Sequence, residues 1–151
     1  MSNEHIRTNN PSQLAVIIVS WNVRVLLAGC LDSLYRDLDS SKVDARVLVI
    51  DNASTDGSVE MIRDKFPRAE LTASEVNLGF AGGNNQGLAL LDFKGLALPQ
   101  APYILFLNPD TEVQSGAIKT MLEFINANPK AAVVTSQLSY GDGTFQHSAF
   151  H

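Results

Sequence analysis

Two apolar runs near the start of the chain constrain its fold more than any other feature of the sequence. Residues 14–19 read LAVIIV and residues 46–50 read RVLVI, and both runs are rich in β-branched side chains. A strand with one face in water alternates apolar and polar residues, whereas a strand covered on both faces is apolar throughout. Because helices cover both faces of parallel sheets, the sequence predicts an α/β protein with a mostly parallel central sheet.

The rest of the chain alternates helical and strand patterns, as such a sheet requires. Helical spacing of apolar residues predicts helices at about residues 23–38, 58–66, 88–91 and 115–127. Further strands are predicted at residues 69–76, 102–110 and 132–138. Asn22 is expected to cap the first helix, the glycine-rich segment 77–87 to form a loop, and Gly141–Gly143 to form a hairpin turn.

Length and composition indicate one globular domain. The 151 residues are 45% hydrophobic and 18% charged, which suits a single buried core. A net charge of -5, a pI near 5.0 and the lack of a Lys/Arg cluster argue against binding to nucleic acid. The apolar runs are too short to cross a bilayer, and the polar residues 1–12 are expected to be a disordered lead-in. The lone cysteine, Cys30, is expected to be a buried thiol, which fits a reducing, cytoplasmic compartment.

Polar residues follow three of the predicted strands at the point where each strand ends. They are Ser20-Trp21-Asn22, Asp51-Asn52-Ala53-Ser54 and Asn108-Pro109-Asp110. Ligands of open α/β sheets bind at the carboxyl ends of the strands, so these residues are candidate ligand contacts. One carboxylate there could accept a hydrogen bond from a base or a ribose, and another could hold a cation against a diphosphate.

Each of these residues also has a purely structural explanation. Asp51 and Asp56 are typical turn formers or helix caps, and Asp110 would favour the start of the next helix. Trp21 is as compatible with a core position as with stacking on a base. The segment after the first strand lacks a glycine-rich phosphate loop, which argues against kinase-like or NAD chemistry.

Four segments, in this order and spacing, resemble the family 2 glycosyltransferases of GT-A fold, particularly their rhamnosyltransferase-like members. The segments are residues 16–22, 49–58, 77–87 and 107–110. The resemblance runs from about Leu14 to the last residue. It implies a GT-A-type, Rossmann-like α/β/α sandwich with a mostly parallel central sheet that binds a nucleotide-diphosphate sugar donor.

The resemblance also implies roles for particular residues. The donor-binding residues would be Ser20, Trp21, Asn22, Asp51, Asn84, Asn108 and Asp110. Asn84 would lie in the glycine-rich loop, and Asp110 would be the last aspartate of the family's Asp-x-Asp motif and a ligand of Mg²⁺ or Mn²⁺. Asn108 stands where many relatives carry the first aspartate. Because Mg²⁺ needs only one or two protein carboxylates when phosphate oxygens and water complete its shell, metal and nucleotide are expected to bind together.

The implied reaction is the transfer, with inversion, of a sugar from a dTDP- or UDP-sugar to a hydroxyl of a cell-surface glycan or lipid-linked acceptor, with rhamnose as one candidate sugar. In the family, the general base lies later in the sequence than the donor-binding half. Residues 13–151 are therefore expected to be a donor-binding domain that is truncated before the acceptor site, and the base is expected beyond His151. A lipid-linked acceptor would bring the protein to the inner face of a membrane as a peripheral component. The sequence makes no prediction of the oligomeric state.

Two other functions are weighed against this one. A catalytically silent nucleotide-binding module would share the same donor site. A nucleotidylyltransferase would need a basic, glycine-rich loop after Asn22, which the sequence lacks.

Overall fold

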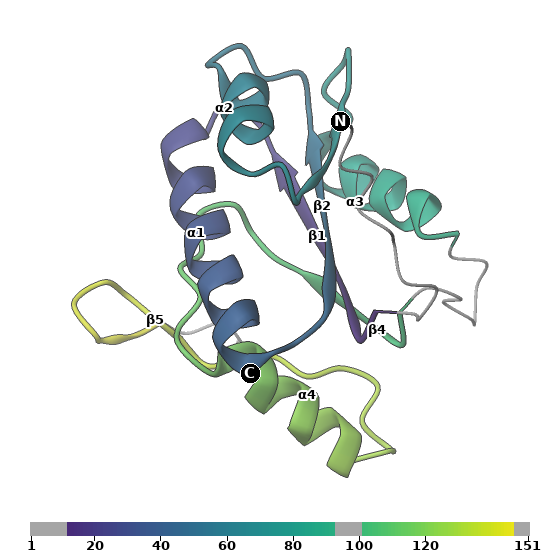
Figure 1. Cartoon of the computed structure of the whole chain (residues 1–151), viewed down its shortest axis with the longest axis vertical. Coiled ribbons are helices and arrows are strands. Elements are labelled where there is room, and N and C mark those ends of the chain that lie inside the picture. The colour runs from purple at the N-terminus through teal and green to yellow at the C-terminus, as the bar shows by residue number, and fades with distance from the viewer. Residues whose placement is uncertain (1–11, 93–100, 147–151) are drawn as a thin grey trace, which may run out of the picture.

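A four-stranded sheet forms the centre of the computed structural model, which describes residues 12–92 and 101–146 (Figure 1). Its strands are β1 (Leu14–Ser20), β2 (Ala45–Asp51), β3 (Glu70–Ala73) and β4 (Tyr103–Phe106). They lie in the order β3-β2-β1-β4, and every neighbouring pair is parallel. The predicted α/β architecture with a parallel central sheet is confirmed.

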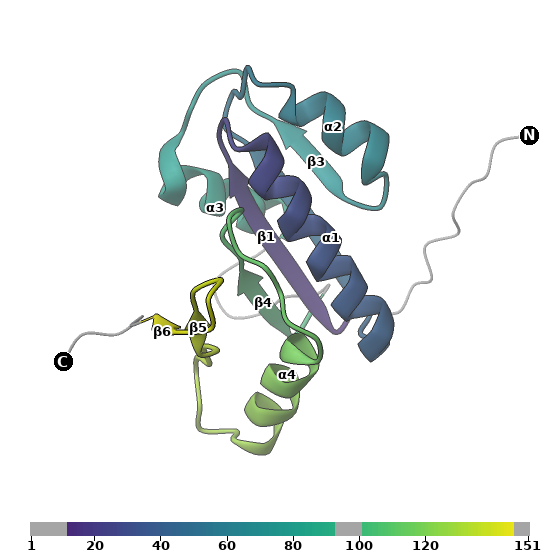
Figure 2. The same ribbon diagram turned by 90° about the vertical axis from the view of Figure 1, so that its left-hand side faces the viewer.

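Helices cover both faces of this sheet. They are α1 (Arg24–Ser41), α2 (Ser58–Lys65), α3 (Gly79–Leu90) and α4 (Ala117–Ala127). The helices α1, α2 and α4 lie on one face, and α3 lies on the other (Figures 1 and 2). All seven residues of β1 are buried, because its side chains point alternately into the two helical layers. This double cover explains why the first apolar run has no polar alternation.

The glycine-rich segment is a helix, and the sequence-based prediction of a loop is wrong. The helix α3 begins at Gly79, where a φ of 70° turns the chain. Gly83 and Gly87 lie one helical turn apart and face β1. A Cβ atom at Gly83 would stand 2.6 Å from Cγ1 of Val19, and one at Gly87 would stand 2.7 Å from Cγ2 of Ile17. The missing side chains allow close packing on the sheet, which outweighs the low helix propensity of glycine.

Asn22 does not cap α1, contrary to the prediction. Its side-chain oxygen accepts the backbone N–H of Thr55 (2.8 Å). The N–H of Arg24, at the start of α1, instead donates to a carboxylate oxygen of Asp56 (2.8 Å). The acceptor comes from the loop after β2 because the parallel strands β1 and β2 bring their following loops to the same edge of the sheet.

The predicted strand at residues 132–138 forms only at its end. That end is β5 (Leu138–Ser139), which pairs antiparallel with β6 (Phe145–Gln146). The predicted turn at Gly141–Gly143 joins the two strands and is confirmed. A β-branched sequence favours a strand only where a partner strand and a buried face are available, and Val133 is 83% exposed.

One prediction falls on residues that the structure does not describe. The predicted lead-in at residues 1–12 lies outside the described residues except for Ser12. Among the helices of residues 12–92 and 101–146, none is long and apolar enough to span a membrane.

Substitution of Gly87 by alanine is expected to lower stability, although alanine favours helices. The added methyl group would overlap the buried Ile17 side chain. Such overpacking costs about 1–3 kcal/mol, whereas the gain in helix propensity is about 1 kcal/mol. Urea denaturation should therefore show a lower midpoint for Gly87→Ala than for the wild type.

Gly29→Ala in α1 is the matched control, because no heavy atom lies within 4 Å of its Cβ position. This variant is expected to raise the midpoint through helix propensity alone. An unchanged or higher midpoint for Gly87→Ala would contradict the close packing of α3 on β1.

Candidate functional site

The carboxyl ends of β1 and β2 lie side by side. Ser20 and Asp51 are register partners at the last position of the two strands. The backbone N–H of Asn52 donates to the carbonyl oxygen of Ser20 (2.8 Å), and the N–H of Ser74, just after β3, donates to the carbonyl oxygen of Asp51 (2.8 Å). The ends of three strands therefore meet at one edge of the sheet.

Three side-chain atoms at this edge are buried without a hydrogen-bond partner among the described residues. They are Ser20 Oγ, Asp51 Oδ2 and Asn52 Oδ1. The other polar atoms of two of these side chains are engaged, since Asp51 Oδ1 accepts the N–H of Ser54 (2.9 Å) and Asn52 Nδ2 donates to the carbonyl of Gly79 (3.1 Å). A buried polar atom without a partner costs about 1–3 kcal/mol, and carboxylate and amide oxygens can only accept hydrogen bonds. The Asp51 and Asn52 oxygens are therefore suited to a ligand that offers N–H or O–H donors.

The loops after β1 and β2 are hydrogen-bonded to each other. The N–H of Asn22 donates to Ser54 Oγ (2.9 Å), and Asn22 Oδ1 accepts the N–H of Thr55 (2.8 Å). Asn22 and Ala53 have φ angles of 52° and 62°, which non-glycine residues rarely adopt, so these bonds hold a strained backbone in place. Trp21, in the same loop as Asn22, is 55% exposed. Its ring is therefore not part of the core and is accessible for stacking.

β4 brings Asn108 and Asp110 to the same edge. The N–H of Leu107 donates to the carbonyl of Ile17 (3.0 Å), so the pairing with β1 continues one residue past the end of β4. The carbonyl of Asn108 then accepts the N–H of Thr111 (3.2 Å), which closes a turn. The side chains of Asn108 and Asp110 are both exposed on this turn.

Cys30 of α1 lies on the buried side of this turn. Its thiol donates to the carbonyl oxygen of Asn108 (3.5 Å). Burial, with a smaller contribution from the negative charge of Asp110, raises the pKa of Cys30 to about 12. The predicted buried thiol is confirmed, and it stays protonated at physiological pH.

Asp110 fits a shared metal site better than a site made by protein alone. Within the part of the chain that the structure describes, no three His, Cys, Asp or Glu side chains form a group that could hold a metal ion. Mg²⁺ usually keeps several waters and is held by one or two carboxylates together with substrate phosphates. An exposed carboxylate on the same turn as the exposed Asn108 amide matches this second kind of site.

Asn84 lies in the second turn of α3. The sequence-based prediction placed it in a loop and is wrong on this point. The side-chain N–H of Asn84 donates to the carbonyl of Phe80 one turn earlier (3.0 Å). The other six predicted donor-binding residues lie at or just after the ends of β1, β2 and β4. Asn52 is among the polar strand-end residues that the sequence marks as candidate ligand contacts, but the predicted donor-binding residues do not include it.

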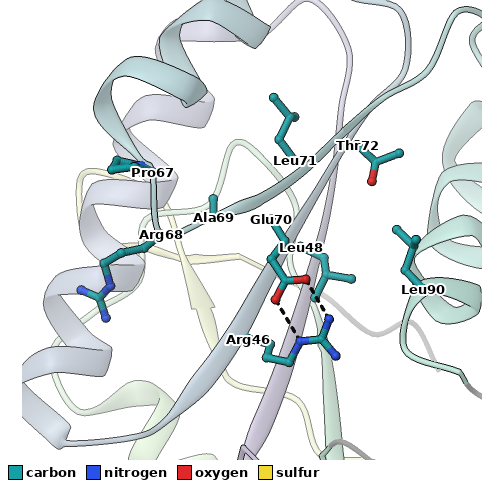
Figure 3. A pocket seen from close by; sticks show the side chains of 9 residues that line it. All are labelled: Arg46, Leu48, Pro67, Arg68, Ala69, Glu70, Leu71, Thr72 and Leu90. Carbon is teal, nitrogen blue, oxygen red and sulfur yellow. Dashed lines mark hydrogen bonds and ion pairs between the residues drawn. The ribbon is translucent and has the colours of Figure 1, made fainter. Parts of the chain in front are cut away.

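A hollow of about 530 Å³ lies elsewhere, along the edge strand β3 (Figure 3). Its lining includes Arg46 and Glu70, which are joined by two hydrogen bonds from the guanidinium to the carboxylate (2.9 and 2.7 Å). Glu70 is paired with Leu48 at the first register position between β2 and β3, whereas Asp51 is paired with Ala73 at the last position. The hollow therefore runs along β3 as far as Thr72, and its lining includes none of Ser20, Asp51 and Asn52.

Comparison with known proteins identifies the family. The model of the family described as Glycosyl transferase family 2 matches residues 15–149. The chain therefore belongs to glycosyl transferase family 2, as the four sequence segments indicated.

Two curated relatives are longer than this chain. The chain is 28% identical over 106 residues to the N-acetylglucosaminyl-diphospho-decaprenol L-rhamnosyltransferase of Mycobacterium tuberculosis, and the match covers 68% of this chain and 34% of that protein. It is 28% identical over 138 residues to the putative teichuronic acid biosynthesis glycosyltransferase TuaG of Bacillus subtilis, covering 91% of this chain and 52% of TuaG. The chain thus spans about a third to a half of the length of these relatives.

Solved structures share the fold. A crystal structure of S. aureus TarS 1-349 in complex with UDP matches with a TM-score of 0.63 and 21% identity, covering 78% of this chain and 33% of that one. The mannosyltransferase PcManGT from Pyrobaculum calidifontis, in complex with GDP-Man and Mn²⁺, matches with a TM-score of 0.56 and 21% identity, covering 78% and 33%. The expected GT-A-type fold is confirmed.

Asp56 makes a pH-dependent contribution to stability. The hydroxyl of Ser58 first, and then the backbone N–H groups of Arg24 and Ser58, hold the pKa of the Asp56 carboxyl below its ordinary value of 3.8. A carboxyl whose pKa is lower in the folded state stabilises that state above the unfolded pKa, and the stabilisation is lost as the pH falls through the folded value. Asp56→Ala should therefore lower the free energy of unfolding at pH 7 by about 1–2 kcal/mol, and the difference from wild type should shrink at pH 3.

Urea denaturation at both pH values measures this difference. Asp64→Ala, at an exposed position of α2, is the control and should change stability little. An equal loss of stability for Asp56→Ala at pH 7 and pH 3 would contradict the pKa shift.

Proposed function

We propose that the chain is the donor-binding part of an inverting glycosyltransferase that transfers a sugar from a nucleotide-diphosphate sugar to a hydroxyl group. The observation that carries this proposal is that Asp51 Oδ2 and Asn52 Oδ1, which can only accept hydrogen bonds, and the Ser20 hydroxyl are buried at the carboxyl ends of β1 and β2 without a partner among the described residues. β4 brings the exposed Asp110 to the same edge of the sheet. Membership of glycosyl transferase family 2 supports the reaction class.

These acceptor atoms favour a nucleobase with a ring N–H group. Uracil and thymine each present an imide N–H and guanine also presents a ring N–H, whereas the ring N3 of cytosine accepts a hydrogen bond. Asp51 Oδ2 would accept the ring N–H, and the exposed Trp21 ring would stack on the base. Among donors with such a base we favour a dTDP- or UDP-sugar, with rhamnose as one candidate, because two relatives support this choice: a rhamnosyltransferase in sequence and TarS, recorded with UDP, in fold.

Asp110 would hold Mg²⁺ or Mn²⁺ jointly with the diphosphate of the donor. When bound, the cation would neutralise the charge that develops on the departing diphosphate. Asn108 would contact the donor through its amide, and Asn22 and Asn84 would complete the donor site. Because a single carboxylate binds Mg²⁺ weakly by itself, metal and nucleotide would bind together. A fold relative in complex with GDP-Man and Mn²⁺ supports a metal at this type of site.

Inversion needs a general base on the side of the sugar opposite the leaving diphosphate. That base and the acceptor site would come from a segment that follows the donor-binding half. The curated relatives support this division, because the chain matches only 34% and 52% of their lengths. Their names favour a cell-surface glycan or a lipid-linked acceptor, which would place the protein at the cytoplasmic face of a membrane as a peripheral component.

The donor site is tested by isothermal titration calorimetry with UDP and dTDP, in chelator and in Mn²⁺. Asp51→Asn should weaken nucleotide binding about 10- to 100-fold under both conditions, because an N–H group would then face the N–H of the base. Asp110→Asn should remove the gain in affinity that Mn²⁺ provides and leave binding in chelator unchanged.

Asp142→Asn is the matched control for these variants. Asp142 lies in the β5–β6 hairpin, where its Oδ1 accepts the N–H and hydroxyl of Thr144 (2.9 and 2.6 Å), and asparagine can replace it as an acceptor. Its nucleotide affinity should equal that of the wild type. If Asp51→Asn binds UDP or dTDP with the affinity of the wild type, the proposed nucleoside site is wrong.

Transfer is tested separately from binding. A chain extended past His151 with the rest of the protein should hydrolyse or transfer from a dTDP- or UDP-sugar in the presence of Mn²⁺, whereas the 151-residue chain should bind the donor with little turnover. If the extended protein binds nucleotide but is inactive with every donor tested, a catalytically silent nucleotide-binding module is the better description.

A further inference from the structure

One face of α1 carries three polar side chains among leucines. Cys30, Ser33 and Asp37, here called the polar stripe, are spaced by three and four residues, so they lie on the same side of the helix. They are only 1%, 3% and 2% exposed. Each is hydrogen-bonded to the backbone of residues 108–118, at separations of 78 to 81 positions in the sequence. The proposed function assigns no role to any of them.

Asp37 anchors the far end of this segment. The N–H groups of Gly116 and Ile118, at the start of α4, donate to its two carboxylate oxygens, with a distance of 3.0 Å for Ile118. The hydroxyl of Ser41 donates to the same carboxylate (3.3 Å). Gly116 has no side chain with which to cap α4, so a negative charge from α1 takes that role. The three bonds also provide partners for a buried carboxylate.

Ser33 anchors the middle of the segment. Its hydroxyl donates to the carbonyl of Cys30 (2.9 Å) and accepts the N–H of Val113 (3.0 Å). Val113 lies only three residues after Asp110, so this bond fixes the chain on one side of the carboxylate. Cys30 fixes it on the other side, through its bond to the carbonyl of Asn108 (3.5 Å).

Asp110 itself has no such anchor. Among the described residues its exposed carboxylate makes no hydrogen bond or ion pair. The position of the carboxylate is therefore set by the backbone on either side of it, at Asn108 and Val113. Both of these points are hydrogen-bonded to the polar stripe, and Val113 also packs against the apolar core beneath the turn.

We infer that the polar stripe of α1 positions Asp110 for its shared metal site, with Ser33 as the principal positioning residue. This inference rests on the proposed function. It predicts that loss of the Ser33 hydroxyl weakens the metal-dependent part of nucleotide binding and spares the metal-independent part. The nucleoside end of the site is held differently, by contacts between the loops after β1 and β2.

The test compares Ser33→Ala with Ser40→Ala in the 151-residue chain. The Ser40 hydroxyl donates to the carbonyl of Asp37 within the same helix (3.1 Å) and makes no described bond to residues 108–118. Calorimetry with UDP measures the affinity in chelator and in Mn²⁺, below the melting temperature of each variant. Ser33→Ala should reduce the gain in affinity from Mn²⁺ about fivefold and leave the affinity in chelator unchanged. Ser40→Ala should match the wild type under both conditions.

Two further variants separate positioning from general destabilisation. Ser33→Thr keeps the hydroxyl and should retain the gain from Mn²⁺. Cys30→Ala removes the other anchor and should reduce the gain about twofold, because a thiol is a weak donor; it also provides the test if Ser33→Ala does not fold. Amide hydrogen exchange at Val113 should be faster in Ser33→Ala than in Ser40→Ala.

The possible outcomes distinguish this inference from the proposed function. If the wild type binds UDP more tightly in Mn²⁺ but Ser33→Ala keeps the full gain, the positioning role is wrong and the proposed function stands. The role is also wrong if Ser33→Ala weakens binding equally with and without metal. If the wild type gains no affinity from Mn²⁺, the shared metal site is wrong, and the positioning role is wrong with it.

Discussion

The parallel pairing of β1 with β2 over seven register positions is the interaction on which the rest of the structure depends. It buries β1 between two helical layers, and it ends both strands at the same level, at Ser20 and Asp51. The loops that follow must therefore meet, and each supplies hydrogen-bond partners that the other lacks. One backbone ladder thus determines both the centre of the core and the base of the proposed nucleotide site.

The fold could be predicted wherever the sequence pattern reflects burial. The runs at residues 14–19 and 46–50 read as doubly covered strands because every side chain in them except Arg46 is buried. The prediction failed where tertiary contacts override local preference. The segment from Gly79 is helical because glycines fit against β1, which a propensity argument cannot detect. The strand expected at residues 132–138 has a suitable sequence but little partner strand to pair with.

The candidate site was predictable to the extent that it lies at strand ends. Ser20 and Asp51 end β1 and β2 and Asp110 follows β4, and the parallel topology alone brings such residues to one edge. The unpaired oxygen of Asn52 could not be predicted, because it depends on which partner its other amide atom takes. The link between Ser33 and Val113 could not be predicted either, since local patterns carry no information about contacts 80 positions apart.

The glycines of α3 also restrict how this protein can move. The methyl groups of Val19 and Ile17 occupy the space that side chains at Gly83 and Gly87 would fill, at two points one helical turn apart. A helix that interlocks with a strand at two points resists sliding along it, because each methyl group would clash with the helix backbone during the movement. α3 and β1 are thus expected to move together as one rigid unit. Adjustment to different ligands is left to exposed side chains such as Trp21, which can change rotamer without disturbing the core.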